Sequence, residues 1–227
     1  MDSVSINRRA AALDLAILIA FFLACYLSAP LLDPILRKGR GLAMVFALAA
    51  YQFAFEGVAP LVIMAIRRER FADYGLTRRN AGRSVALGLA MAGIYDLSMS
   101  WHARALLWIP LWRQPAVRMS LAAGFPQCIV GLAVTVLAWG FFEGFFGVFF
   151  ARKFNQAIGH SGYGWLAPGV LGFALFNGLI HLTVGQGMEG FIGSFASGYA
   201  IAVIPAVTRN AWGSSLVQTL TNAVGRQ

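Results

Sequence analysis

Long apolar segments, each interrupted by no more than one ionisable side chain, are the feature that most constrains this fold. A helix needs about 20 mainly apolar residues to cross the hydrocarbon core of a bilayer. Charged residues make up 12% of the 227 residues and hydrophobic residues 59%, whereas a soluble domain carries about 25% charge. We therefore expect an all-α protein, a polytopic transmembrane helix bundle.

The apolar segments predict about seven spans, at residues 10–32, 41–66, 84–101, 127–151, 168–184, 190–207 and 211–224. The first is expected to end at the break formed by Asp33 and Pro34, and the fourth at Arg152 and Lys153. Residues 102–118 are rich in aromatic side chains and favour an interfacial segment or an eighth span. Residues 1–119 then hold the N-terminal transmembrane helices with a basic cytoplasmic loop, and residues 120–227 hold a core helix bundle.

The net charge of +9 comes from 18 Lys and Arg against 9 Asp and Glu. The basic residues form short clusters between apolar segments, a placement typical of membrane topology rather than of a nucleic-acid-binding stripe. With the N-terminus inside, eleven basic residues fall in cytoplasmic segments and seven outside. The positive-inside rule thus predicts a cytoplasmic N-terminus. We expect a multi-pass protein of the bacterial inner membrane, in contact with the lipid bilayer and with no nucleic acid.

Ionisable side chains inside spans are costly, so each is a candidate for function. Five stand out: Glu56, Asp96, Glu143, His181 and Glu189. Glu189 is expected at the start of the sixth helix, where a carboxylate interacts favourably with the helix dipole. Glu56, one turn after Gln52, and Asp96 are expected to pair with each other or with arginine side chains.

Glu143 lies in the sequence Gly-Phe-Phe-Glu-Gly-Phe-Phe-Gly. Helical spacing places Gly140, Gly144, Gly147 and Ala151 on the same face as Glu143, and small residues at this period let another helix approach closely. One interpretation is a tight helix contact around a single buried glutamate. The other is a general base held in a dry cavity.

Estimated depths place further polar side chains near the level of Glu143. At 1.5 Å per residue, Glu143 lies about 13 Å from Arg152, and His181 about 20 Å from Pro168. Gln218 and Asn222 share a helix face, and lie about 13 Å and about 20 Å beyond Arg209. The sequence therefore predicts one intramembrane cavity with Glu143, His181, Gln218 and Asn222.

These segments resemble a known family: intramembrane proteases that include the CAAX prenyl-protein endopeptidases and bacterial bacteriocin-processing or abortive-infection proteins (CPBP family). The family shows Glu-Glu-x-x-x-Arg, then Phe-x-x-x-His, then His-x-x-x-Asn or Asp. The segments 142–147, 177–181 and 218–222 are similar to these three motifs. Two further segments, Asp73-Tyr74-Gly75-Leu76 and Asn210-Ala211-Trp212, are similar to the residues that precede two helices in the family. The resemblance covers residues 120–224 well and the front half loosely.

Several positions depart from the family pattern. On the best register, Phe142 and Gly147 stand where the first glutamate and the arginine are expected, whereas a one-residue shift makes Glu143 the first glutamate and puts Gly144 in the second position. Asn177 replaces phenylalanine, and Gln218 replaces the third-motif histidine. The resemblance implies that Glu143 and His181 polarise a water molecule, and that the amides of Gln218 and Asn222 stabilise an oxyanion. Glu143 and His181 are too few for a zinc site, so no metal or cofactor is predicted.

Three functions remain open. The first is an intramembrane endopeptidase acting on a membrane-anchored peptide. The second is a degenerate, non-catalytic relative that serves as a membrane scaffold or assembly partner. The third is a small transporter or channel using Glu56, Asp96 and Glu143. The second is favoured, because a deep carboxylate without a cation stays protonated and is a poor base.

Small residues in the sixth helix bear on partners of the chain. Gly190, Ser194 and Gly198 repeat every four residues, as do Gly193 and Ser197. This stripe favours internal packing, with a docking face for another membrane protein as the alternative.

Overall fold

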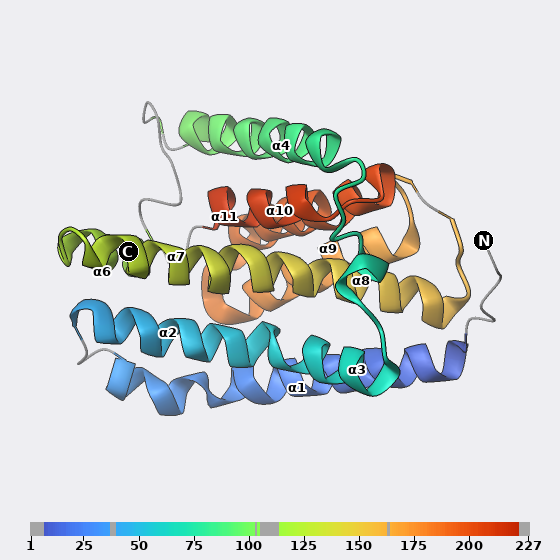
Figure 1. Cartoon of the computed structure of the whole chain (residues 1–227), viewed down its shortest axis with the longest axis horizontal. Helices are drawn as coiled ribbons and strands as arrows, with labels where there is room; N and C mark the ends of the chain where they lie inside the picture. The colour runs from blue at the N-terminus through green and yellow to red at the C-terminus, as the bar shows by residue number, and fades with distance from the viewer. Residues whose placement is uncertain (1–6, 37–39, 103, 105–113, 163, 223–227) are drawn as a thin grey trace.

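The computed structural model describes residues 7–36, 40–102, 104, 114–162 and 164–222, and the secondary structure in these ranges is helical. Most helices lie side by side along one long axis (Figure 1). Their bounds are α1 Arg8–Leu36, α2 Gly41–Glu56, α3 Val58–Arg67, the 3-10 turn η1 Phe71–Tyr74, α4 Ala81–His102, α6 Pro115–Ala122, α7 Gln127–Thr135, the π-helical η2 Val136–Phe142, α8 Glu143–Ile158, α9 Pro168–His181, the π-helical η3 Leu182–Gln186, α10 Gly187–Thr208 and α11 Trp212–Thr221.

Three of the described helical segments are long and apolar enough to cross a membrane: Arg8–Leu31, Gln127–Ile158 and Gly187–Thr208. The helices α2 and α3, bent by 45° at their junction, make a fourth if they count as one span. The helical, membrane-type fold agrees with the sequence prediction, but the predicted number of seven spans is not confirmed. Residues 105–113, most of the predicted eighth span, lie outside the described residues.

Two predicted helix ends are wrong. Helix α1 continues past Pro34 to Leu36, since apolar membrane helices tolerate proline. Helix α8 continues past Arg152 and Lys153 and ends before Gly159, whose positive φ of 74° gives the left-handed C-terminal cap. Lys153 does not end the helix, because acidic side chains from two other elements accept its hydrogen bonds.

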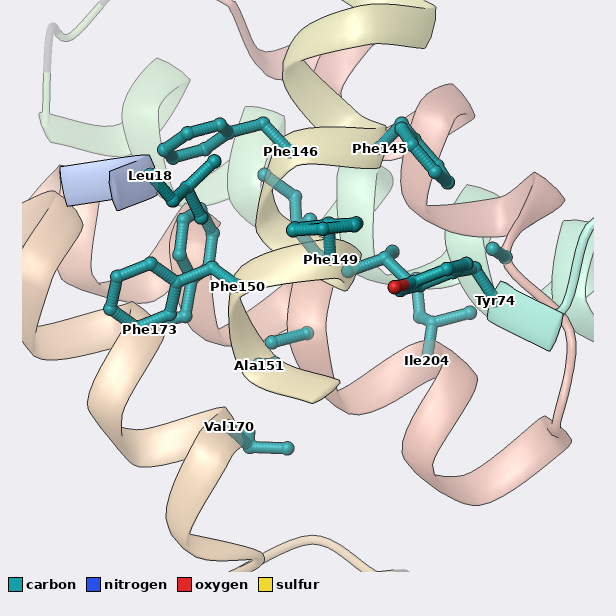
Figure 2. Packing of buried hydrophobic residues seen from close by; sticks show 14 of the residues in the cluster. Leu18, Tyr74, Phe145, Phe146, Phe149, Phe150, Ala151, Val170, Phe173 and Ile204 are labelled. Carbon is teal, nitrogen blue, oxygen red and sulfur yellow. The ribbon is translucent and has the colours of Figure 1, made fainter. Parts of the chain in front are cut away.

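Phenylalanines of α8 form the centre of the larger hydrophobic core. Phe145 and Phe149 face Tyr74 of η1, with ring centroids 5.5 and 4.9 Å from its ring. Phe146 and Phe150 project toward α9 and α1, where Phe173 and Leu18 lie (Figure 2). With large rings on two sides, α8 occupies the middle of the bundle and fixes the position of Glu143 at its N-terminal end.

The glycine face of η2 and α8 packs against α11, as predicted for small residues at this spacing. A Cβ atom added at Gly144 would lie 2.9 Å from the Cα atom of Ser215, and one at Gly140 would meet the Thr219 side chain. Further along, Gly147 faces Phe173 and Ile201 of α9 and α10. The close approach brings the polar residues at the end of α11 to Glu143.

The small residues of α10 pack internally, as favoured from the sequence. Asn177 of α9 donates a 2.8 Å hydrogen bond from Nδ2 to the Ser194 carbonyl oxygen. A Cβ atom at Gly198 would meet Asn177 and the backbone of Ala174. The packing joins α9 and α10 as an antiparallel pair.

A polar junction sets the start of α11. The Ala211 N–H donates to the Gly75 carbonyl oxygen at 3.0 Å, and Ser84 Oγ donates to the Asn210 carbonyl oxygen at 2.9 Å. The two lead-in segments of the sequence resemblance, residues 73–76 and 210–212, are therefore in direct contact. The junction couples η1 and α4 to α11.

Candidate functional site

Glu143 lies at the junction between the π-helical η2 and α8. A π turn widens the helix locally and is often found at functional sites. The carboxylate points toward side chains from two other helices. Asn222, which directly follows α11, donates a hydrogen bond from Nδ2 to Glu143 Oε2 at 2.6 Å, and Gln218, one turn earlier, lies beside the same carboxylate.

A second carboxylate, Glu56 at the end of α2, reaches the same place. Gln52 Nε2 donates to Glu56 Oε2 at 2.8 Å and to Glu143 Oε2 at 3.2 Å. One amide nitrogen thus joins two carboxylates from two helices. Only 7% of Glu56 is exposed, and Glu143 is half-buried.

The expected pairing of Glu56 with Asp96 or an arginine is therefore wrong. Asp96 lies on α4, which packs against α10 and α11 rather than α2, and its Oδ1 atom is buried without a hydrogen bond. The consecutive predicted spans formed by α2–α3 and by α4 are therefore not packed against each other in this bundle. Glu189 does lie in the first turn of α10, as predicted.

A small cavity borders the two carboxylates. Its volume is about 10 Å³, and its lining includes Glu56, Glu143, Gln218 and Asn177 together with the rings of phenylalanines. A space of this size holds about one water molecule. The cavity has no room for a peptide chain in this conformation.

His181 lies at the C-terminal end of α9, one turn beyond Asn177. Its Nδ1 atom is 3.0 Å from Gln186 Oε1 of η3, and its side chain is half-buried. Helix α9 contributes Phe173, Phe176 and Asn177 to the cavity lining, and His181 is not among the described lining residues. The structure therefore brings Glu143, Gln218 and Asn222 together and places His181 one turn away from the cavity lining.

Gln52, Glu56 and Asn177 complete the polar cluster beyond the four residues predicted from the sequence. The four-residue spacing of Gln52 and Glu56 signalled a shared helix face. Nothing in the sequence indicated that α2 would pack beside α8. Asn177 occupies the phenylalanine position of the family motif that ends at His181, and this departure was the signal for it in the sequence.

No group of three or more His, Cys, Asp or Glu side chains in the described part of the chain is arranged to hold a metal ion. Glu56 and Glu143 are the two acidic side chains at the cavity, and their described partners are amides. Chemically, this arrangement can hold a proton or a single water molecule between neutral donors.

Comparisons of the chain with protein-family models, with curated proteins and with solved structures found no match.

Proposed function

We propose that this chain is a non-catalytic integral membrane protein, a degenerate relative of the CPBP intramembrane proteases that serves as a membrane scaffold or assembly partner. One observation carries the proposal. The Glu143 carboxylate is held by the neutral amides of Gln52 and Asn222, with a second carboxylate beside it, in a cavity of single-water size. Two acidic groups in such a place share a proton, and a protonated glutamate is a poor base.

The position of His181 supports the same proposal. Its described partner is Gln186, so the imidazole is directed to η3 rather than to the cavity beside Glu143. Water activation by a Glu and His pair needs both groups within hydrogen-bonding reach of one water molecule. The amide network instead joins three helices, which is a structural role.

The arrangement of basic residues supports a seven-span topology with a cytoplasmic N-terminus in a bacterial inner membrane, which we include in the proposal. Lys153 of α8 reaches Asp14 of α1 and Glu69 of the α3–η1 connection. A Cβ atom at Gly159 would meet the Arg8 side chain. The basic segments assigned to the cytoplasm from the sequence thus gather at one end of the bundle, where Figure 1 also shows α3 and the start of α1.

A second candidate function is an intramembrane endopeptidase, and the position of Glu56 favours it. The family motif carries two adjacent glutamates, whereas here α2 supplies the second carboxylate through Gln52. A pair of carboxylates can divide acid and base roles when one holds the proton and the other does not. This function requires an opened form of the cavity that admits a peptide.

Glu143→Gln separates the two functions. The protein with this substitution is expressed in a deletion strain at wild-type level, and membrane-anchored peptides are compared by mass spectrometry. The scaffold proposal expects full rescue of the deletion phenotype, an unchanged peptide profile, and a change in unfolding free energy under about 1 kcal/mol, because the amide replaces a protonated carboxyl. Glu189→Gln, on an exposed carboxylate, is the control. Lost rescue and accumulation of uncleaved peptides in a stable Glu143→Gln protein would overturn the proposal and establish the peptidase.

A further inference from the structure

A larger cavity lies one helical turn from the carboxylate pair and plays no part in the proposed function. Its volume is about 270 Å³, and α6, α7, η2 and α11 contribute to its lining, which is almost wholly apolar. An apolar cavity of about 150 Å³ is enough to bind benzene. This cavity is therefore large enough for a small organic molecule or for part of an acyl chain.

One polar side chain in the lining has no hydrogen-bond partner. Gln114, directly before α6, is 1% exposed, and neither its Oε1 nor its Nε2 atom makes a hydrogen bond. The hydroxyl groups of Thr135 and Thr219, which also line the cavity, each donate to a carbonyl oxygen one turn earlier in their own helix. A buried amide without partners is destabilising, so this site is incomplete unless a ligand pairs with the amide.

The geometry of a primary amide defines the group that would satisfy it. It offers N–H donors and a carbonyl acceptor side by side, so its best partner also donates and accepts, as a carboxamide or a protonated carboxylic acid does. An ester or an alkane does not. Specificity of this kind is strong, because a ligand that lacks the group leaves buried polar atoms unpaired.

The cavity reaches the apolar outer surface of the bundle. Leu121 of α6 and Val136 of η2 line it and are also 55% and 46% exposed. In a membrane protein, apolar side chains exposed in this way face lipid. A ligand would therefore enter from the bilayer and leave the rest of its chain among the lipid tails.

From these observations we infer that the cavity binds the head of a single-chain amphiphile, a fatty acid in its neutral form or a fatty amide, with Gln114 pairing to its carboxyl or carboxamide group. The apolar walls take the first carbons of the chain, and the remainder extends past Leu121 and Val136. The site is separate from the Glu143 cluster, so the inferred ligand binding does not depend on whether that cluster is catalytic.

Binding of palmitamide, which does not titrate, tests the inference. Full-length protein in micelles is titrated with palmitamide, palmitic acid and methyl palmitate, and complexes are counted by native mass spectrometry. We expect palmitamide to bind at least about tenfold more tightly than methyl palmitate, since the ester cannot donate to the Gln114 oxygen. Binding by palmitic acid only at low pH, alongside palmitamide at every pH, identifies the neutral acid as the second ligand. Equal binding of amide and ester would overturn the inference.

Substitutions in the lining give the controls. Gln114→Leu is expected to weaken palmitamide about tenfold and to raise the melting temperature of the ligand-free protein, because an unpaired buried amide is removed. Val136→Trp fills the cavity and should abolish binding. Leu137→Trp changes a neighbouring side chain that is exposed and outside the lining, so it should bind as wild type. Unchanged affinity in Gln114→Leu, or equal loss in the two tryptophan variants, would contradict the site.

Discussion

Lys153 donates a 2.9 Å hydrogen bond from Nζ to Asp14 Oδ2, across 139 residues of sequence, and both side chains are almost fully buried. Lys153 also donates to Glu69 Oε1 at 2.7 Å, and Arg67 donates to Asp14 from Nε and from its terminal nitrogen. The charges balance within this group, which ties α1, α3 and α8 together.

Lys153→Met should therefore destabilise the protein by about 3–5 kcal/mol, because removing one partner of a buried ion pair leaves Asp14 and Glu69 with Arg67 as the one remaining cation of this group. Unfolding by denaturant in micelles measures the change. Asp73→Asn is the control, since Asp73 pairs with Arg70 at 3.7 Å and both are solvent-accessible. We expect that control to cost no more than about 1 kcal/mol. Similar losses in both variants would show that burial does not strengthen the Lys153 group.

Tyr74 links this group to the hydrophobic core and predicts a pH dependence. Its hydroxyl donates to Glu69 Oε2 at 2.6 Å. Burial, and then the bond to Glu69, raise the pKa of Tyr74 above its ordinary value of 10.0. The folded state therefore holds this proton more tightly than the unfolded state does, so the stabilisation is complete below pH 10 and is lost as the pH rises further.

Tyr74→Phe should cost about 1.5–3 kcal/mol at neutral pH, the contribution of a hydrogen bond to a charged group. Its stability should fall less steeply than that of the wild type above about pH 10, because it has no proton to release at this site. Unfolding free energies measured at neutral and alkaline pH test both statements. A constant difference between the two proteins across this range would contradict the assignment. Tyr199→Phe, at a hydroxyl that donates to the Trp165 carbonyl at 3.2 Å, controls for general loss of a tyrosine.

Local periodicity accounts for what the sequence could predict of the site. The spacing of four and three residues between the glycines around Glu143 predicted a close helix contact, and α11 packs there. The depth estimates for Glu143 and Asn222 differed by about 7 Å, yet the two side chains are in direct contact. Boundaries read from sequence carry errors of this size, and the contact depends on helix packing that depth alone does not define.

The features of the site that the sequence did not predict depend on how each helix is rotated about its axis and on which helices are neighbours. The depth of a residue in the membrane does not define which face of α9 meets the cavity. In the structure Asn177 lines the cavity, while His181 bonds to Gln186 of η3. The π-helical turns on either side of these motifs also change the rotation of the residues that follow. Lys153 looked like the end of a span because a lone lysine avoids lipid, whereas its acidic partners come from distant segments.

Gly144→Ala tests the close approach of α8 and α11. The added Cβ atom would lie 2.9 Å from the Cα atom of Ser215, and backbone atoms cannot move aside as a flexible side chain does. We expect a loss of about 1–3 kcal/mol in unfolding free energy, the usual cost of overpacking. Gly93→Ala in α4 is the matched control, because nothing lies within 4 Å of its added Cβ atom. That substitution should stabilise the helix by about 0.5–1 kcal/mol, and a loss of stability in Gly93→Ala equal to that in Gly144→Ala would contradict the steric explanation.

Asn210 offers the sharpest test of the junction that starts α11. Its Nδ2 atom donates to the carbonyl oxygens of Thr77 and Arg79 at 2.7 and 2.9 Å, and its Oδ1 atom accepts from the Trp212 N–H at 3.0 Å. These partners engage both the nitrogen and the oxygen of the amide, and the residue is fully buried. Asn210→Asp keeps the acceptor for Trp212 but replaces the donor by an oxygen that faces two carbonyl oxygens.

The substitution should therefore cost about 1–3 kcal/mol for each carbonyl group left without its donor, although the two side chains have nearly the same shape. Asn80→Asp is a graded comparison, because Asn80 Nδ2 donates to one carbonyl oxygen, that of Thr208, at 2.9 Å. We expect its loss of stability to be smaller than that of Asn210→Asp when both are measured by denaturant unfolding. The junction also positions α11, which carries Gln218 and leads directly into Asn222. Asn210→Asp should therefore loosen the Glu143 cluster, detectable as faster hydrogen exchange at the end of α11. Unchanged exchange there in a destabilised protein would show that the cluster holds α11 without help from the junction.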